Sequence, residues 1–236
     1  MSIQEQVQAV QARIRAAELA AGRPEGSVTL VAATKVQTDE TIRAAIAAGI
    51  TVCGENRVQE FNAHYGAGAY EGADVQFIGH LQKNKVKYLV GKVSLIQSVD
   101  SAALLEAISA RAERLGLVQD VLIEVNIGAE ASKSGVRPEE AAALLAQAQE
   151  LPGVRPRGLM AIPPVSREEG GNRPFFAELY QLFVDIKGQM GDNNSDLDCL
   201  SMGMSGDFED AIAEGATMVR VGTALFGSRP PMRQQG

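Results

Sequence analysis

A lysine ends an apolar run of strand length near the amino terminus. Residues 28–35 have the sequence VTLVAATK and follow a Gly-Ser pair. This run predicts a buried parallel strand, and α/β barrels carry their chemistry at the carboxyl ends of such strands. There the amine of Lys35 could form a Schiff base with an aldehyde. Taken alone, the segment favours a lysine that snorkels outward from the edge of the core.

Two turns near the carboxyl terminus combine hydroxyls, glycines and backbone N–H groups. Residues 201–206 (SMGMSG) follow one apolar run, and residues 220–223 (RVGT) follow the next. Such turns can bind a phosphate, helped by the amino terminus of a helix. In α/β barrels the loops after the seventh and eighth strands are the usual phosphate site. Either turn alone would be an ordinary turn of small residues, but the pair predicts a phosphate site.

The phosphate site and the amine of Lys35 would share one end of a barrel. The combination fits a phosphorylated aldehyde, and pyridoxal 5′-phosphate fits it more specifically than phosphorylated sugar aldehydes do. Because free lysine has a pKa of ~10.4, burial or a cationic neighbour would have to lower the pKa of Lys35 for efficient attack.

Other chemical motifs are missing from the sequence. It has no G-x-G-x-x-G after the first predicted strand, no Walker-type phosphate loop and no G-x-S-x-G nucleophile elbow. The glycine-rich residues 66–72 have the wrong spacing and predict a surface loop. His64 and His80 form no ligand pair, so no metal site is expected. Cys53 and Cys199 lack metal or redox spacing and are expected to be small buried side chains in a reducing compartment.

The composition is that of a globular protein with a large core. Of 236 residues, 45% are hydrophobic and 22% are charged, and the formal net charge is −7. An acidic chain is not expected to bind nucleic acid or an anionic membrane. No apolar run reaches membrane-spanning length, and the amino terminus lacks a signal-peptide pattern. We therefore expect a cytoplasmic protein.

Short apolar runs alternate with helical patterns along the chain. The apolar runs are residues 28–35, 51–53, 75–79, 94–98, 120–126, 154–160, 197–201 and 217–221. Helices are predicted over residues 2–21, where Ser2 and Glu5 have capping-box spacing, over 101–115, from Pro138 onward, and over 176–186 before Gly188 and Gly191. The alternation predicts an α/β fold, a single (β/α)8 barrel of the TIM type with an extra amino-terminal helix. A doubly wound open sheet is the alternative.

The barrel is expected to occupy residues 1–236 as one domain. Residues 1–27 would be the amino-terminal helix and its lead-in, and residues 228–236 a flexible tail. Residues 165–174 and 192–195 are rich in Gly, Pro, Asn or charge, and they are the internal segments expected to be least ordered.

An ordered series of motifs resembles the pyridoxal phosphate homeostasis proteins, the YggS/PROSC family. The matching segments are LVAATK (30–35), GENRVQE (54–60), FIGHLQKNK (77–85), VN (125–126), KSG (133–135), GLM (158–160), SMGMS (201–205) and RVGTALFG (220–227). Each is weak alone, but the ordered set is highly specific. The chain departs from the family pattern at Thr34 (usually Ser), Thr38 (often Pro) and Gly206 (commonly acidic), and only Gly206 leaves open how the next helix is capped.

The resemblance implies a barrel similar to the amino-terminal domain of alanine racemase, and roles for individual residues. Lys35 would carry pyridoxal phosphate as a Schiff base, and Arg220 would face the pyridine nitrogen. The other cofactor-binding residues implied are Asn56 and Met160 along the ring, and Ser201, Ser205, Gly222 and Thr223 around the phosphate. A guanidinium that donates to the pyridine nitrogen leaves it unprotonated, which makes the ring a poor electron sink.

Residues around these positions have less specific interpretations. Glu55 and Glu60 could neighbour the cofactor, although solvated helix positions explain them as well. Lys83, Lys85 and Lys87 form a basic group that fits a solvated helix start, or a surface where an anionic cofactor or a client protein docks.

Two functions are compatible with the resemblance. The first is a carrier with little or no catalysis that acts in intracellular pyridoxal phosphate homeostasis and amino-acid/keto-acid balance. The second is an amino-acid racemase of the alanine racemase type. Racemization needs acid/base groups on both faces of the substrate. The tyrosine-bearing second domain of alanine racemase is not expected here, which favours the carrier. We further expect a monomer, with ligand-free pyridoxal-phosphate enzymes as recipients.

Overall fold

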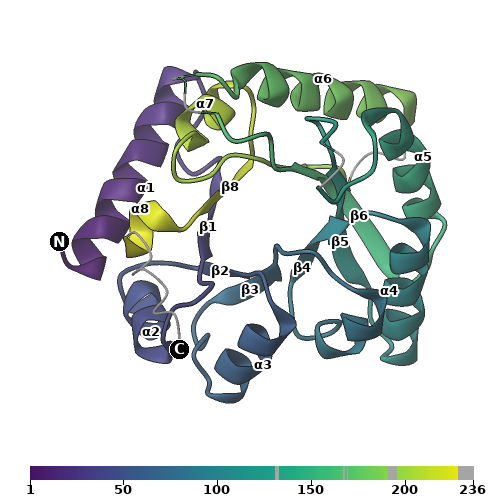
Figure 1. Cartoon of the computed structure of the whole chain (residues 1–236), viewed down its shortest axis with the longest axis horizontal. Coiled ribbons are helices and arrows are strands. Elements are labelled where there is room, and N and C mark those ends of the chain that lie inside the picture. The colour runs from purple at the N-terminus through teal and green to yellow at the C-terminus, as the bar shows by residue number, and fades with distance from the viewer. Residues whose placement is uncertain (131–132, 167, 169, 191–195, 228–236) are drawn as a thin grey trace, which may run out of the picture.

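Parallel strands close into a barrel in which β8 pairs with β1 (Figure 1). The computed structural model describes residues 1–130, 133–166, 168, 170–190 and 196–227. Within this described part the strands are β1 (Thr29–Ala33), β2 (Val52–Glu55), β3 (Asp74–Phe77), β4 (Leu95–Val99), β5 (Gln119–Val125), β6 (Val154–Ala161), β7 (Cys199–Ser201) and β8 (Met218–Val221). The predicted (β/α)8 barrel is confirmed. The alternative of an open sheet is excluded because β1 and β8 pair with each other and leave no free edge.

Helices surround the barrel and connect its strands. They are α1 (Ile3–Ala20), α2 (Asp39–Ala47), α3 (Val58–Gly66), the 3₁₀ helix η1 (Lys83–Tyr88), α4 (Ala102–Arg114), α5 (Pro138–Gln149), α6 (Arg173–Met190), α7 (Phe208–Ala213) and α8 (Thr223–Phe226). The extra amino-terminal helix α1 is confirmed with its capping box between Ser2 and Glu5. It lies on the outside of the barrel against α2, α7 and α8 (Figure 1).

The sequence prediction differs from the structure at the end of α6. The pattern predicts a helix over residues 176–186 before Gly188 and Gly191, but α6 continues through Gly188 to Met190. A glycine inside a helix costs only about 1 kcal/mol, and the burial of Phe183 and Ile186 on the preceding turns outweighs that cost. Gly191, residues 192–195 and the tail 228–236 lie outside the described residues.

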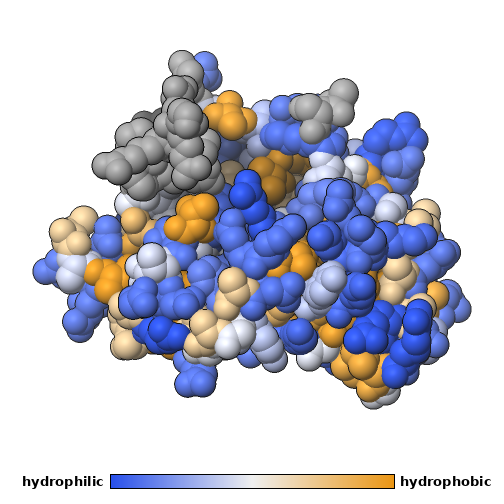
Figure 2. Space-filling model, turned by 60° about the horizontal axis from the view of Figure 1, so that its bottom comes forward, coloured by the Kyte–Doolittle hydropathy of each residue, from blue (hydrophilic) through white to orange (hydrophobic). Residues whose placement is uncertain are grey.

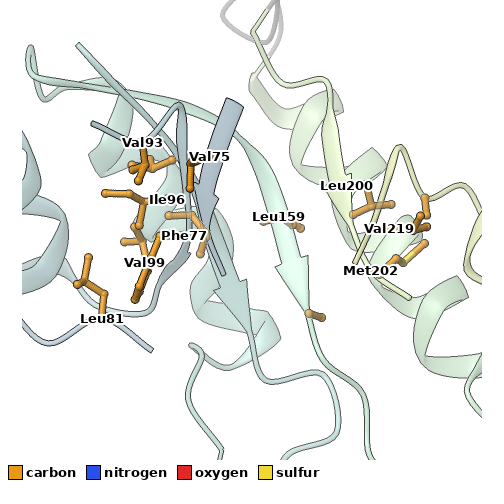
Figure 3. Close-up of a cluster of buried hydrophobic side chains, with 14 of the residues drawn as sticks. Val75, Phe77, Leu81, Val93, Ile96, Val99, Leu159, Leu200, Met202 and Val219 are labelled. Atoms are coloured by element: carbon orange, nitrogen blue, oxygen red, sulfur yellow. The ribbon is translucent and has the colours of Figure 1, made fainter. Parts of the chain in front are cut away.

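Alternate side chains of the strands form two separate cores. In β1, Val31 and Ala33 belong to a cluster inside the barrel, whereas Ala32 packs outward toward the helices. This period of two is the ordinary geometry of a strand. Figure 3 shows parts of the outer core, where Phe77 of β3 lies with Ile96 of β4. The alternation matters for the site because it decides which polar residues enter the barrel.

The surface is largely hydrophilic on the face shown in Figure 2, where hydrophobic residues are scattered rather than gathered into one large patch. Scattered hydrophobic residues are normal on a protein surface. None of the helices in the described part of the chain combines the length and apolarity that crossing a bilayer requires.

Candidate functional site

Because side chains alternate between the two faces of a strand, two predicted site residues point into the barrel. In β8, Met218 belongs to the interior cluster while Val219 and Val221 pack outward, so Arg220 faces the interior. In β6, Met160 belongs to the same interior cluster and is 0% exposed. Both residues lie within two positions of the carboxyl end of their strands, which is the end where α/β barrels carry chemistry.

Arg220 is a buried cation with two hydrogen-bond partners. Its Nη1 donates to Oγ of Ser201 at 2.5 Å, and its Nη2 donates to the carbonyl oxygen of Ala161 at 2.9 Å. Burial lowers the pKa of Arg220 to about 10, and the carboxylate of Glu124 opposes that shift. The guanidinium therefore keeps its positive charge at neutral pH.

Ser201 ends β7 and connects Arg220 to two glutamines across the barrel interior. Its hydroxyl accepts from Arg220 and donates to Oε1 of Gln97 at 2.7 Å, and Nε2 of Gln97 donates to Oε1 of Gln76 at 2.6 Å. Because a serine has one hydroxyl proton, the order of donors is fixed. We call Arg220, Ser201, Gln97 and Gln76 the interior relay. The predicted phosphate role of Ser201 has no support in these contacts, which tie it to Arg220.

Backbone N–H groups and a hydroxyl converge where the loops after β7 and β8 meet. The N–H groups of Gly222 and Ala224 both donate to Oγ of Ser205, at 3.1 and 3.2 Å. Thr223 begins α8, so these groups belong to the first turn of a helix. Such a cradle of N–H donors suits an anion. The structure thus brings together Ser205, Gly222 and Thr223 of the predicted phosphate residues.

Lys35 lies in a tight turn that follows β1. The N–H of Gln37 donates to the carbonyl oxygen of Thr34 at 3.1 Å, which closes a β-turn with Lys35 and Val36 at its centre. Val36 has a φ of 59°, a left-handed conformation that β-branched residues rarely adopt. A positive φ at this third position is typical of a type II turn, which normally has glycine there. Lys35 itself is partly buried.

Asn56 follows β2 directly, also at the carboxyl end of the barrel. The neighbouring loop approaches it so closely that a Cβ added to Gly79 would lie 2.1 Å from the carbonyl oxygen of Asn56. Within the described residues, Oδ1 of Asn56 is buried without a hydrogen-bond partner. Leaving a buried acceptor unpaired is costly, so this atom marks a place where a ligand can supply a donor.

Glu55, the last residue of β2, is buried rather than solvated. It is 0% exposed, and its Oε1 accepts from the hydroxyl of Thr34 at 2.6 Å and from that of Tyr70 at 2.9 Å. The expected solvated helix position is therefore wrong for Glu55. Burial raises the pKa of Glu55, partly opposed by the hydrogen bonds from Thr34 and Tyr70. The surface loop predicted over residues 66–72 is wrong for Tyr70, because this residue is only 6% exposed.

Polar groups that the sequence prediction missed lie at the same end of the barrel. Glu124 of β5 is 6% exposed, and its Oε1 accepts from the hydroxyl of Ser134 at 2.8 Å. Burial raises the pKa of Glu124, and the charge of Arg220 opposes the shift. Gln97 and Gln76 of the interior relay were also missed. The available signal was a polar residue at an inward position of an apolar strand, where burial is unusual.

Thiol and metal chemistry find no support here. Burial raises the pKa of both Cys53 and Cys199 to about 12, so neither is a reactive thiolate at neutral pH. Each histidine pairs with a carboxylate. Among the residues that the structure describes, no group of three or more His, Cys, Asp and Glu side chains could hold a metal ion.

Comparison with known sequences identifies relatives over nearly the whole chain. A family model described as the alanine racemase N-terminal domain matches residues 6–230. A pyridoxal phosphate homeostasis protein from Aquifex aeolicus is 47% identical over 229 residues, which cover 97% of this chain and 99% of that protein. A protein of the same name from Pseudomonas aeruginosa is 40% identical and is matched over 97% of this chain and 96% of its own length.

Solved structures give the same result. PipY of Synechococcus elongatus with PLP bound has a TM-score of 0.82 and 33% identity, covering 96% of this chain and 100% of that one. An unknown protein from Bifidobacterium adolescentis has a TM-score of 0.87 and 40% identity, with coverages of 95% and 94%. Alanine racemase of Clostridium difficile, at 15% identity and a TM-score of 0.76 over 57% of its chain, shares the fold alone. The chain therefore belongs to the family of the pyridoxal phosphate homeostasis proteins.

Proposed function

We propose that this chain binds pyridoxal 5′-phosphate (PLP) at the carboxyl end of the barrel and holds it as a Schiff base on Lys35. In this proposal it acts in intracellular PLP homeostasis and amino-acid/keto-acid balance, with little or no catalysis. The observation that carries the proposal is the buried guanidinium of Arg220, two residues before the N–H cradle at Gly222. The names of the relatives and the PLP-bound structure of PipY support it.

The residues at this end of the barrel fit the parts of PLP. The N–H cradle suits the phosphate, the N–H groups of Arg220 suit an acceptor nitrogen, and the unpaired Oδ1 of Asn56 suits a ligand donor. The residues that would hold the cofactor are Lys35, Asn56, Met160, Ser205, Arg220, Gly222 and Thr223. Ser201 would act through Arg220, which it holds in place.

Lys35 and Arg220 have different tasks in this site. When bound, PLP supplies an electrophilic aldehyde carbon and a conjugated ring. Lys35 contributes an amine, which must lose its proton before it can attack. Arg220 stays charged and donates to the pyridine nitrogen, so that nitrogen stays unprotonated. Because an unprotonated ring withdraws electrons weakly, Arg220 favours a carrier over a catalyst.

Absorption spectroscopy with added PLP tests the proposal. We expect the wild-type protein to turn yellow, its visible absorption to change on borohydride treatment, and mass spectrometry to find the reduced adduct on Lys35. Lys35→Ala should abolish the visible absorption. Lys92→Ala removes an exposed lysine that precedes β4, at the other end of the barrel, and is the matched control, which should bind PLP as the wild type does. A protein that takes up no added PLP would contradict the proposal.

Exchange of the α-proton in deuterated buffer separates a carrier from a racemase. With alanine and other amino acids, we expect exchange far slower than the typical enzyme turnover of ~10 s⁻¹. Racemization would need a second acid/base group, such as a tyrosine hydroxyl. The hydroxyl of Tyr70 donates to Glu55 on the outward-facing side of β2, away from the barrel interior, which supports the expectation of slow exchange. Exchange at a rate near the typical enzyme turnover would contradict the carrier function and support a racemase.

The proposal includes a monomer that passes PLP to ligand-free PLP enzymes. Sedimentation of the PLP-loaded protein is expected to give a mass near 25.0 kDa. Transfer is expected to appear as loss of the visible absorption together with recovery of activity in a ligand-free acceptor enzyme. A stable dimer, or retention of PLP in the presence of the acceptor, would contradict this part.

A further inference from the structure

Two carboxylates from one segment contact the residues on either side of Lys35. Oε2 of Glu60 accepts from the N–H of Val36 at 3.0 Å, and Oε1 of Glu55 accepts from the hydroxyl of Thr34 at 2.6 Å. Glu55 ends β2, and Glu60 lies in the first turn of α3. The lysine is therefore the central residue of a segment that is tied to the neighbouring strand–helix unit at both ends.

The bond to Glu60 falls on the residue with the strained backbone. Val36 holds a φ of 59° although the residue is 57% exposed, so packing against the core does not impose this conformation. The interactions that favour it are the turn hydrogen bond to Thr34 and the bond to the carboxylate, which is stronger than one to a neutral acceptor. Glu60 is itself held by Arg57 at 3.5 Å.

We propose that Glu60 is a positioning residue for Lys35, which keeps Val36 in the left-handed conformation and so holds the turn in the form that presents the amine to PLP. This inference rests on the proposed function. Without the bond, Val36 relaxes toward an ordinary φ, and only a fraction of the molecules keeps the competent turn. The apparent affinity for PLP then falls in proportion to that fraction.

Removing the carboxylate and then the strain tests the inference. Glu60→Ala should raise the PLP concentration for half-saturation about tenfold, which corresponds to about 1.4 kcal/mol. Adding Val36→Gly to Glu60→Ala should restore most of the affinity, because glycine adopts a positive φ without strain. Glu60→Gln keeps a carbonyl acceptor and should lie between wild type and Glu60→Ala. Glu71→Ala, which removes an exposed carboxylate elsewhere, is the control and should match the wild type.

Hydrogen exchange of the ligand-free proteins provides a readout that does not need PLP. The peptide that contains Val36 and Gln37 should exchange faster in Glu60→Ala than in the wild type, with the rest of the barrel unchanged. Equal exchange and equal half-saturation in Glu60→Ala would overturn the inference, as would a loss of affinity that Val36→Gly does not restore. If the wild type itself takes up no PLP, the proposed function fails, while the exchange experiment still decides whether Glu60 holds the turn.

Discussion

The parts of the barrel that carry Lys35 and Arg220 are held by different means. On the β1–β2 side, Lys35 occupies a turn with an exposed, left-handed Val36, and the carboxyl groups of Glu55 and Glu60 fix its neighbours. On the β7–β8 side, Arg220 is 4% exposed and reaches, through Ser201, the neutral side chain of Gln97. One side uses local backbone strain and hydrogen bonds to carboxyl groups, and the other uses a buried chain of hydrogen bonds.

This difference matches the tasks proposed for the two residues. The amine of Lys35 has to form and break a bond as PLP is held and released, and a short turn can adjust locally without moving the barrel. Arg220 only has to keep one orientation, and its buried hydrogen bonds to Ser201 and to the carbonyl oxygen of Ala161 fix that orientation strongly. We therefore expect substitutions on the Arg220 side to affect global stability, and those on the Lys35 side to affect mainly the turn.

The largest effect is expected from Ser201→Ala. The change leaves Oε1 of Gln97 and an N–H of Arg220 without partners in a fully buried place, which should lower the free energy of unfolding by ~3 kcal/mol. Urea denaturation of the PLP-free protein measures it. Ser205→Ala is the matched control, because its partly exposed hydroxyl can be replaced by water, and a smaller loss is expected. Equal losses in both variants would contradict a special role for the interior relay.

A smaller, pH-dependent effect is expected from Glu55→Gln. Burial raises the pKa of Glu55 above its ordinary 4.5, so the folded protein binds this proton more tightly than the unfolded chain does. Wild-type stability should therefore fall relative to Glu55→Gln as the pH rises from 4.5, until the raised pKa is passed. A tenfold difference in proton affinity between the folded and the unfolded chain corresponds to about 1.4 kcal/mol.

Denaturation at a series of pH values from mildly acidic to neutral measures this difference. Glu71→Gln, at an exposed position, is the control and should give a profile parallel to that of the wild type. A Glu55→Gln profile that also runs parallel to the wild type would show that the carboxyl group of Glu55 titrates alike in the folded and unfolded chain.

The smallest effect on stability is expected from Val36→Gly alone. Glycine has more conformational entropy in the unfolded chain, which should lower the free energy of unfolding by ~0.5–1 kcal/mol. Relief of the left-handed strain at residue 36 should nearly cancel this loss. Val118→Gly is the control, because Val118 is similarly exposed (55% against 57%) but has no positive φ, and it should lose stability without compensation. Equal losses in the two variants would mean that the turn around Lys35 stores no strain.

The sequence predicted the barrel and the position of several site residues for local reasons. The apolar runs have strand length and alternate with helical patterns, and both features can be read from short stretches of sequence. Once β8 is recognised, the period of two turns Arg220 to the same side as Met218. The capping box of α1 is likewise local, because Ser2 and Glu5 are three residues apart.

The tertiary structure alone decided what these residues contact. Ser201 and Gln97 are 104 positions apart in the chain, and only closure of the barrel brings their side chains within hydrogen-bond distance. The same closure buries Glu55 and gives it Tyr70 as a partner, which no local pattern indicates. The left-handed Val36 is a further example, because its sequence favours an extended backbone and a carboxylate from α3 holds the turn instead. The sequence by itself thus determined the strands and the chemical groups at their ends, whereas long-range packing determined which of those groups are held still.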